Sequence, residues 1–252
     1  MSNILEEISP SPRRVMTIFY IIDTSGSMKG ARIGAVNAAM DDCRTLLKDV
    51  AVSNDDADIK IAVMEFSSGF EWVTPTTGPV SVEDFQWRDL NAYGLTDFGA
   101  ALKELDKKLS RNEFLKSQTG AYAPVILLFS DGQPTDQWEE ALNKIRANNW
   151  FKNAIKIAID INGESDKNVL AQFTGNVEAI IESNDNEMLK NMIKKVSVRA
   201  SEFQSHSKSS ADSDITPEQD SANIVNSVKL EIDDELNVSD PSDNQHWNTE
   251  FP

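Results

Sequence analysis

The chain has 252 residues, of which 24 are basic and 41 acidic, so its formal net charge is −17. This acidic balance argues against binding to a nucleic-acid backbone or to an anionic membrane surface, because both would repel the chain. A single cysteine, Cys43, excludes an internal disulfide framework and a cysteine-based zinc cluster. The two histidines, His206 and His246, lie near the C-terminus, so histidine-based catalysis in the body of the chain is not expected.

Residues 1–14 are predicted to form an N-terminal arm. They carry acidic residues where a secretory signal would carry basic ones followed by an apolar stretch. No apolar run in the chain approaches the roughly 18 residues that a membrane-spanning helix requires. We therefore expect a cytoplasmic protein that does not bind membranes.

Residues 15–199 are expected to form one α/β domain, because strand-like and helix-like segments alternate along them. Continuous apolar runs predict buried strands, and apolar residues recurring every three or four positions predict helices. The predicted strands are Met16–Ile22, Asp58–Phe66, Phe70–Val73, Pro124–Phe129, Ala154–Ile159 and Val177–Ile181. The predicted helices are Ile33–Val50, Phe98–Leu109, Asp136–Ala147, Lys167–Phe173 and Asn186–Val198.

The order of these segments predicts a doubly wound, mostly parallel six-stranded sheet with helices on both faces. Only a few residues separate the second strand from the third, so these two strands are expected to form a hairpin with an antiparallel edge strand.

Residues 200–252 are predicted to form a largely disordered acidic tail. From Ser201 onward the sequence has twelve Asp or Glu residues and two Lys, with few apolar residues, so little surface is available to offset the entropy of ordering. One apolar patch alternates in the manner of a short strand or a docking peptide: Ile224, Val225, Val228, Leu230, Ile232, Leu236 and Val238. A solvated tail is favoured here over a binding or self-inhibiting segment.

Short oxygen-bearing side chains follow two of the predicted strands and precede one predicted helix. The first strand ends in Asp23-Thr24-Ser25-Gly26-Ser27, the strand at Pro124–Phe129 leads into Ser130-Asp131-Gly132, and Thr96 stands just before the helix at Phe98. Since ligands in such sheets bind at the carboxyl ends of strands, these loops are expected to converge. Two carboxylates and three hydroxyls match the preference of Mg²⁺ for oxygen ligands.

This pattern resembles the metal-ion-dependent adhesion site (MIDAS) of von Willebrand factor A domains, and the resemblance covers nearly all of residues 15–199. It implies that Ser25, Ser27 and Thr96 bind a Mg²⁺ or Mn²⁺ ion directly and that Asp23 and Asp131 act through water. With few carboxylates around it, such an ion keeps much of its positive charge and attracts an external carboxylate. The resemblance therefore implies a non-catalytic module that binds an Asp or Glu side chain of a protein partner.

Within that family, the chain is similar to bacterial TerY-like proteins, which are linked to tellurite resistance and stress gene clusters. The stretches that carry this similarity are Asp23–Met28, Gly94–Leu102 and Leu170–Asn176. It implies a protein kinase and a metal-dependent serine/threonine phosphatase as partners.

Two other interpretations of the motif remain open. In the first, Asp23 and the serines only cap the following helix and shape a turn. In the second, the protein is a metal-dependent phosphatase or hydrolase that uses Asp23 or a serine as nucleophile. The phosphatases that begin in this way place a second Asp where this chain has Ser25, and a serine hydrolase would need a base that the body of the chain lacks.

Several other residues carry weaker expectations. Asp97 either caps the helix that follows it or supports the metal ligands from behind, and the cap is favoured. Asp160 is expected to be a solvated loop carboxylate. Cys43 is expected to pack in the core. Trp72 and Trp87 either rim a partner surface or pack the hairpin. Lys29 and Arg32 are the basic groups best placed to meet an acidic partner.

Overall fold

Strand β1 (Arg14–Asp23) lies in the middle of the sheet in the computed structural model, which describes residues 13–183, 185–206 and 215–238. Every residue of β1 except Arg14 is buried. Its side chains alternate between two cores, with Ile18 and Tyr20 on one face and Phe19 and Ile21 on the other. A strand covered on both faces needs apolar residues at consecutive positions, which explains the uninterrupted apolar run in the sequence.

The described residues form one seven-stranded sheet in the order β3-β2-β1-β5-β6-β7, with the short β4 also paired to β2. The other strands are β2 (Ala57–Ser67), β3 (Gly69–Trp72), β4 (Val80–Ser81), β5 (Val125–Ser130), β6 (Ile155–Ile161) and β7 (Ile180–Ser183). Strands β2, β1, β5, β6 and β7 are parallel, whereas β3 and β4 run antiparallel to β2. The predicted architecture is confirmed, but the prediction of six strands omitted β4, which is too short to show a period.

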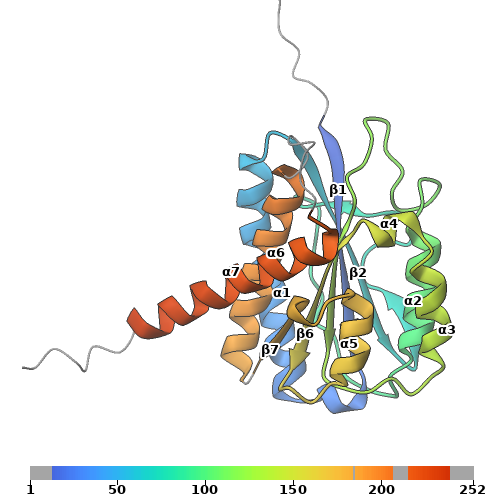
Figure 1. Cartoon of the computed structure of the whole chain (residues 1–252), viewed down its shortest axis with the longest axis vertical. Coiled ribbons are helices and arrows are strands. Elements are labelled where there is room, and N and C mark those ends of the chain that lie inside the picture. The colour runs from blue at the N-terminus through green and yellow to red at the C-terminus, as the bar shows by residue number, and fades with distance from the viewer. Residues whose placement is uncertain (1–12, 184, 207–214, 239–252) are drawn as a thin grey trace, which may run out of the picture.

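Helices cover both faces of the sheet (Figure 1). One core includes residues of α1 (Ala31–Ser53) and α6 (Asn186–His206). The opposite core includes residues of α2 (Phe98–Lys108), α3 (Trp138–Ile145), α4 (Asn149–Lys152) and α5 (Lys167–Thr174). None of the helices that the structure describes has the length and apolar character needed to cross a bilayer.

The expectation of a largely disordered tail is wrong for residues 217–238, which form helix α7 (Pro217–Val238). Ile224, Val228 and Ile232 recur every fourth residue and are buried in the same core as α1 and α6, whereas Leu230 is 66% exposed. The patch therefore follows helical spacing rather than the alternation of a strand. Its apolar face is sufficient to order the helix because it packs on α6 and β6.

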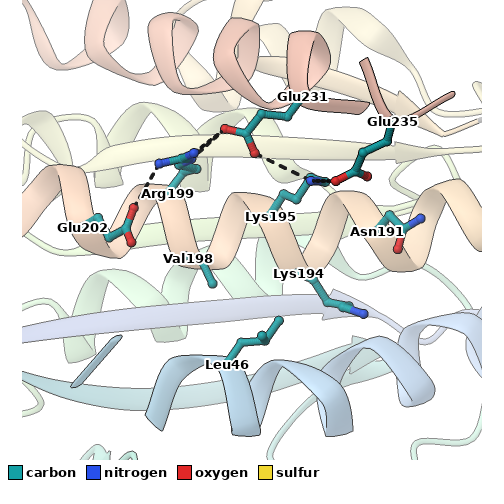
Figure 2. Close-up of a pocket in the computed structure, with 9 residues that line it drawn as sticks. All are labelled: Leu46, Asn191, Lys194, Lys195, Val198, Arg199, Glu202, Glu231 and Glu235. Atoms are coloured by element: carbon teal, nitrogen blue, oxygen red, sulfur yellow. Dashed lines mark hydrogen bonds and ion pairs between the residues drawn. The ribbon is translucent and has the colours of Figure 1, made fainter. Parts of the chain in front are cut away.

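Ion pairs with basic residues offset part of the acidic charge of α7. Glu231 lies 2.6 Å from Arg199 and 3.6 Å from Lys195, both on α6, and Glu235 lies 2.7 Å from Lys195 (Figure 2). Near the start of α7, Glu218 lies 3.5 Å from the amine of Lys156. These partners belong to the body of the domain, so the acidic composition of this segment does not prevent it from packing there.

The predicted domain boundaries also shift at both ends of the body. Arg14 is the first residue of β1 rather than the last residue of an arm, and α6 continues past residue 199 to His206. Arg13 precedes β1 and is described, whereas residues 1–12 of the predicted arm and residues 207–214 and 239–252 of the predicted tail lie outside the described residues.

Candidate metal centre

The candidate site lies where the carboxyl ends of β1 and β5 meet. These two strands are neighbours in the sheet, with β2 on the far side of β1 and β6 on the far side of β5. Loops that follow adjacent strands at such a reversal of strand order leave a crevice between them. The loop after β1 contains the short 3₁₀ helix η1 (Gly26–Met28), and the segment before α2 approaches the same crevice.

Asp23 ends β1 as a fully buried carboxylate. Its Oδ1 accepts a hydrogen bond from the Ser25 amide at 2.8 Å, and its Oδ2 accepts one from Ser130 Oγ at 2.8 Å. Burial raises the pKa of Asp23 to about 6, although both of these hydrogen bonds favour the ionised form. The site therefore holds a carboxylate that is costly to ionise without a cation nearby.

A chain of short contacts links the two serines to Asp131. Ser25 Oγ lies 3.0 Å from Ser27 Oγ, and Ser27 Oγ donates to Oδ1 of Asp131 at 2.7 Å. Ser25 and Asp131 are buried, whereas Ser27 is exposed. Residues 104 positions apart are thus in direct contact.

Gly132 shows how closely Thr96 approaches the same crevice. A Cβ atom placed on this glycine would lie 3.6 Å from Ser27 Oγ, 3.7 Å from Thr96 Oγ1 and 3.9 Å from Asp23 Oδ2. Oxygens from the end of β1 and its loop and from the segment before α2 therefore border one small space beside Gly132, which lies in the loop after β5. All five sequence-predicted residues, Asp23, Ser25, Ser27, Thr96 and Asp131, lie in this crevice.

Backbone hydrogen bonds hold the three loops together. The Tyr93 amide donates to the Thr24 carbonyl at 2.7 Å, and the Gly26 amide donates to the Gly94 carbonyl at 3.1 Å. The Thr135 amide donates to the Thr96 carbonyl at 2.9 Å, and Thr135 Oγ1 accepts from the Thr96 amide at 3.1 Å. The fold therefore fixes the relative positions of the three segments that carry the candidate oxygens.

The donor set fits a hard divalent cation. Oxygens in an octahedral Mg²⁺ shell are about 2.9 Å apart, and the contacts among Ser25, Ser27 and Asp131 measure 2.7–3.0 Å. Among the described residues, no group of three or more His, Cys, Asp or Glu side chains is arranged to hold a metal ion. A cation in this crevice would therefore depend on the hydroxyls as well as on the two carboxylates.

Helix capping does not account for the motif. The residue at the N-cap of α1 is Gly30, which has no side chain to form a capping bond. Ser25 stands at the N-cap of η1, but its side chain makes no capping bond there. Asp23 does shape a turn through its bond to the Ser25 amide, but its other oxygen is held by β5.

Asp97 does not cap α2, contrary to the sequence prediction. Its Oδ2 accepts from the Gly69 amide at 2.8 Å and so fixes the β2–β3 turn. Asp136 takes the capping role, because its two carboxylate oxygens accept from the amides of Gly99 and Ala100 at 2.9 and 3.0 Å. The cap of α2 thus comes from a segment distant in sequence, and local sequence patterns could not have revealed it.

Asp160 is fully buried at the end of β6, so its assignment as a solvated loop carboxylate is wrong. Its Oδ1 accepts from the Ser165 amide at 3.0 Å, and its Oδ2 makes no hydrogen bond within the described part of the chain. Ser165 Oγ in turn donates to the Ser130 carbonyl at 2.7 Å. The β6–α5 loop is thereby tied to the strand that carries the candidate site.

The remaining expectations have mixed outcomes. Cys43 is buried as predicted, and burial raises the pKa of its thiol to about 12. Trp72 packs on Phe114, with its ring centroid 4.7 Å away, and Trp87 packs against the core. Lys29 is exposed, whereas Arg32 is bound by acidic residues of this chain.

Sequence reasoning gave no role to Ser130, although it directly precedes Asp131. It also missed Asn162 and Glu164, which contact Arg32 from the β6–α5 loop. The Asn162-Gly163 pair marks a turn in that loop, but nothing in the sequence indicates that the loop contacts Arg32.

Comparisons with known proteins agree with this architecture. Residues 18–133 match the family model for the von Willebrand factor type A domain. No match was found among curated proteins. Among solved structures, proximal thread matrix protein 1 from the mussel byssus is similar with a TM-score of 0.58 and 18% identity, covering 75% of this chain and 48% of that one.

Two further structures share the fold. A von Willebrand factor type A protein from Catenulispora acidiphila has a TM-score of 0.53 and 18% identity, covering 75% of this chain and 42% of that one. A second structure of the mussel protein, described as having a zinc-occupied MIDAS motif, has a TM-score of 0.51 and 16% identity, covering 75% of this chain and 46% of that one. The chain therefore spans less than half the length of these structures.

The family match covers residues 18–23 of β1, the Asp23–Ser27 loop and Asp131, and the solved structures share the fold of the sheet. Residues 18–133 of this chain are accordingly similar to the von Willebrand factor type A domain, and the sheet that contains them has the fold of these solved structures.

Proposed function

We propose that this domain is a non-catalytic recognition module that binds an Asp or Glu side chain of a protein partner through a Mg²⁺ or Mn²⁺ ion. The von Willebrand factor type A domain is a metal-dependent protein-interaction fold. The observation that carries the proposal is the convergence of Asp23, Ser27 and Thr96 oxygens around the space beside Gly132.

The proposed roles follow from charge and position. Ser25, Ser27 and Thr96 offer neutral hydroxyls, while Asp23 and Asp131 hold the negative charge at the two sides of the crevice. An ion bound there would supply a positive charge with a coordination position open to a carboxylate. Because Ser27 is exposed, a partner can approach from its side.

The alternative of a phosphatase or hydrolase that uses Asp23 as nucleophile has less support. Both carboxylate oxygens of Asp23 accept hydrogen bonds and the residue is fully buried, which disfavours direct attack on a substrate. A nucleophile must come within bonding distance of the reacting atom, whereas in the proposed function this carboxylate would act on the ion through water.

The biological setting that we propose rests on sequence resemblance. Asp23–Met28, Gly94–Leu102 and Leu170–Asn176 are similar to bacterial TerY-like proteins of tellurite-resistance and stress systems. We accordingly propose a cytoplasmic protein whose partners include a protein kinase and a metal-dependent serine/threonine phosphatase.

The test compares the full chain with Asp23→Asn, which keeps the side-chain size but removes the charge, and with Glu139→Ala, which removes an exposed carboxylate on α3. Calorimetric titration with MgCl₂ and MnCl₂ should show one site in the wild type and in Glu139→Ala, and none in Asp23→Asn. Binding of candidate kinase and phosphatase partners should be lost in EDTA and in Asp23→Asn. Partner binding that persists in EDTA would contradict the proposal.

The enzyme alternative is tested on the same three proteins. Incubation with a generic phosphoester and Mg²⁺ should give no turnover above background. Turnover that is present in the wild type and absent from Asp23→Asn would favour the enzyme.

A further inference from the structure

Arg32, the second residue of α1, binds to the rim of the candidate metal site. Its Nη1 lies 2.6 Å from Oδ2 of Asp131 and 3.3 Å from the Ser27 carbonyl oxygen. Its Nη2 lies 2.9 Å from the carboxylate of Glu164. The side-chain amide of Asn162 is oriented with its oxygen toward Arg32, which satisfies both the oxygen and the nitrogen of that amide. The oxygen then accepts from Arg32 Nε at 2.8 Å and from Nη2 at 3.2 Å. The guanidinium is thus held by Asp131 and the Ser27 carbonyl on one side of the contact and by Asn162 and Glu164 of the β6–α5 loop on the other.

The loop that holds Arg32 has a specific backbone shape. Asn162 and Gly163 have φ values of 62° and 65°, and Asn162 is the one non-glycine residue with positive φ in the part of the chain that the structure describes. Asn-Gly is the residue pair that adopts two successive positive φ values most easily. The end of the loop is fixed by Ser165, which binds Asp160 and the Ser130 carbonyl. Asn162 and Glu164 are thereby held in position on either side of this turn.

Asp131 is shared between Arg32 and the crevice. Its Oδ1 accepts from Ser27 Oγ inside the site, while its Oδ2 contacts Arg32 outside it. Arg32 carries a permanent positive charge because its guanidinium does not lose its proton in proteins. This positive charge weakens the attraction of the crevice for a cation in two ways. It neutralises the charge of Asp131, and it repels a cation bound on the other side of that carboxylate.

We propose that Arg32 is a built-in competitor of the metal ion, which lowers the affinity of the site for divalent cations by occupying Asp131. This inference rests on the proposed function, since it concerns the same crevice. Its consequence is that occupancy of the site follows the free divalent-ion concentration instead of being permanent. The β6–α5 loop strengthens this competition, because Asn162 and Glu164 hold the Arg32 guanidinium next to Asp131.

A purely structural role for Arg32 predicts the opposite sign. If Arg32 served only to orient the Asp131 carboxylate for the ion, its removal would misplace a ligand and weaken metal binding. If Arg32 competes with the ion, its removal strengthens metal binding. The direction of the change therefore separates the two roles.

The experiment is calorimetric titration of the full chain with MnCl₂ and with MgCl₂. Arg32→Gln should bind the ion at least about tenfold more tightly than wild type, because a unit charge next to the site is removed. Arg32→Lys, which keeps the charge, and Lys29→Gln, which removes the charge of an exposed neighbour, should each change affinity by less than about threefold. Equal or weaker binding by Arg32→Gln, when the wild type binds, would overturn the inference.

A second variant guards against misfolding of Arg32→Gln. Asn162→Gly removes one acceptor of the guanidinium while keeping the positive φ that the turn requires. It should shift metal affinity in the same direction as Arg32→Gln by a smaller factor, and unchanged or weaker affinity would count against the inference. If neither the wild type nor any variant binds the ions, the proposed function itself fails. Binding by Arg32→Gln together with none by the wild type would support the competitor role most strongly.

Discussion

Ser130 and Asp23 join the ends of the two central parallel strands through one buried hydrogen bond, in which Ser130 Oγ donates to Asp23 Oδ2 at 2.8 Å. The two residues are 107 positions apart in the sequence. Because this oxygen of Asp23 is also the one closest to Gly132, the bond fixes the carboxylate oxygen that borders the open space of the site.

Ser130→Ala is expected to weaken both the fold and the metal site. Loss of a hydrogen bond to a buried carboxylate should lower the free energy of unfolding by about 1–3 kcal/mol. Affinity for Mn²⁺ should fall several-fold, because Asp23 is then less stably ionised and less well oriented. Urea denaturation and metal titration measure the two effects. A double-mutant cycle with Asp23→Asn, measured by urea denaturation, should show that Ser130 and Asp23 are coupled in stability. Unchanged metal affinity in Ser130→Ala would contradict the assigned role of Ser130.

Gly132→Ala is expected to block the site without harming the fold. The added methyl group would contact oxygens of Ser27, Thr96 and Asp23 at 3.6–3.9 Å, which is ordinary van der Waals distance but fills the space that an ion needs. Metal binding should be lost, while the free energy of unfolding measured by urea denaturation stays within about 1 kcal/mol of wild type. Gly34→Ala on α1, whose new methyl meets no atom within 4 Å, is the matched control and should bind metal normally.

Helix α7 is expected to contribute to the stability of the whole domain. Ile224 is 3% exposed in the core, so Ile224→Ala should lower the free energy of unfolding by about 2–4 kcal/mol. Leu230 on the same helix is 66% exposed, and Leu230→Ala should change the free energy of unfolding by less than about 0.5 kcal/mol. Equal effects of the two substitutions in urea denaturation would mean that α7 does not pack as described.

Asp160 is expected to make stability depend on pH. Burial raises the pKa of this carboxyl, so the folded state holds its proton more tightly than the unfolded chain, in which aspartates titrate near about 3.9. The contribution of protonated Asp160 to the free energy of unfolding is complete below that pH and is lost as the pH rises through the folded-state pKa of this residue. Wild type should therefore lose stability relative to Asp160→Asn as the pH rises above about 4. A difference that stays constant as the pH rises in urea denaturation would contradict the argument.

The sequence was sufficient to predict the alternating elements of the body and the five oxygen-bearing residues of the candidate site. Buried parallel strands such as β1 need an unbroken apolar run, and that requirement is visible locally. The site was predictable because a reversal of strand order brings loops after neighbouring strands together, and Asp23 and Asp131 each follow such a strand. Their role as metal ligands stays a prediction that the titrations address.

Tertiary structure alone decided the features that depend on long-range contacts. Helix α7 is acidic and only sparsely apolar, and it orders because α6 and β6 offer both a surface for Ile224 and cations for Glu231. Arg32 is 99 residues from Asp131, and nothing in their local sequence indicates that they form an ion pair at the rim of the site. Local periodicity reports which face of an element is buried. It does not report which distant residue will lie opposite, because that is set by how the layers pack.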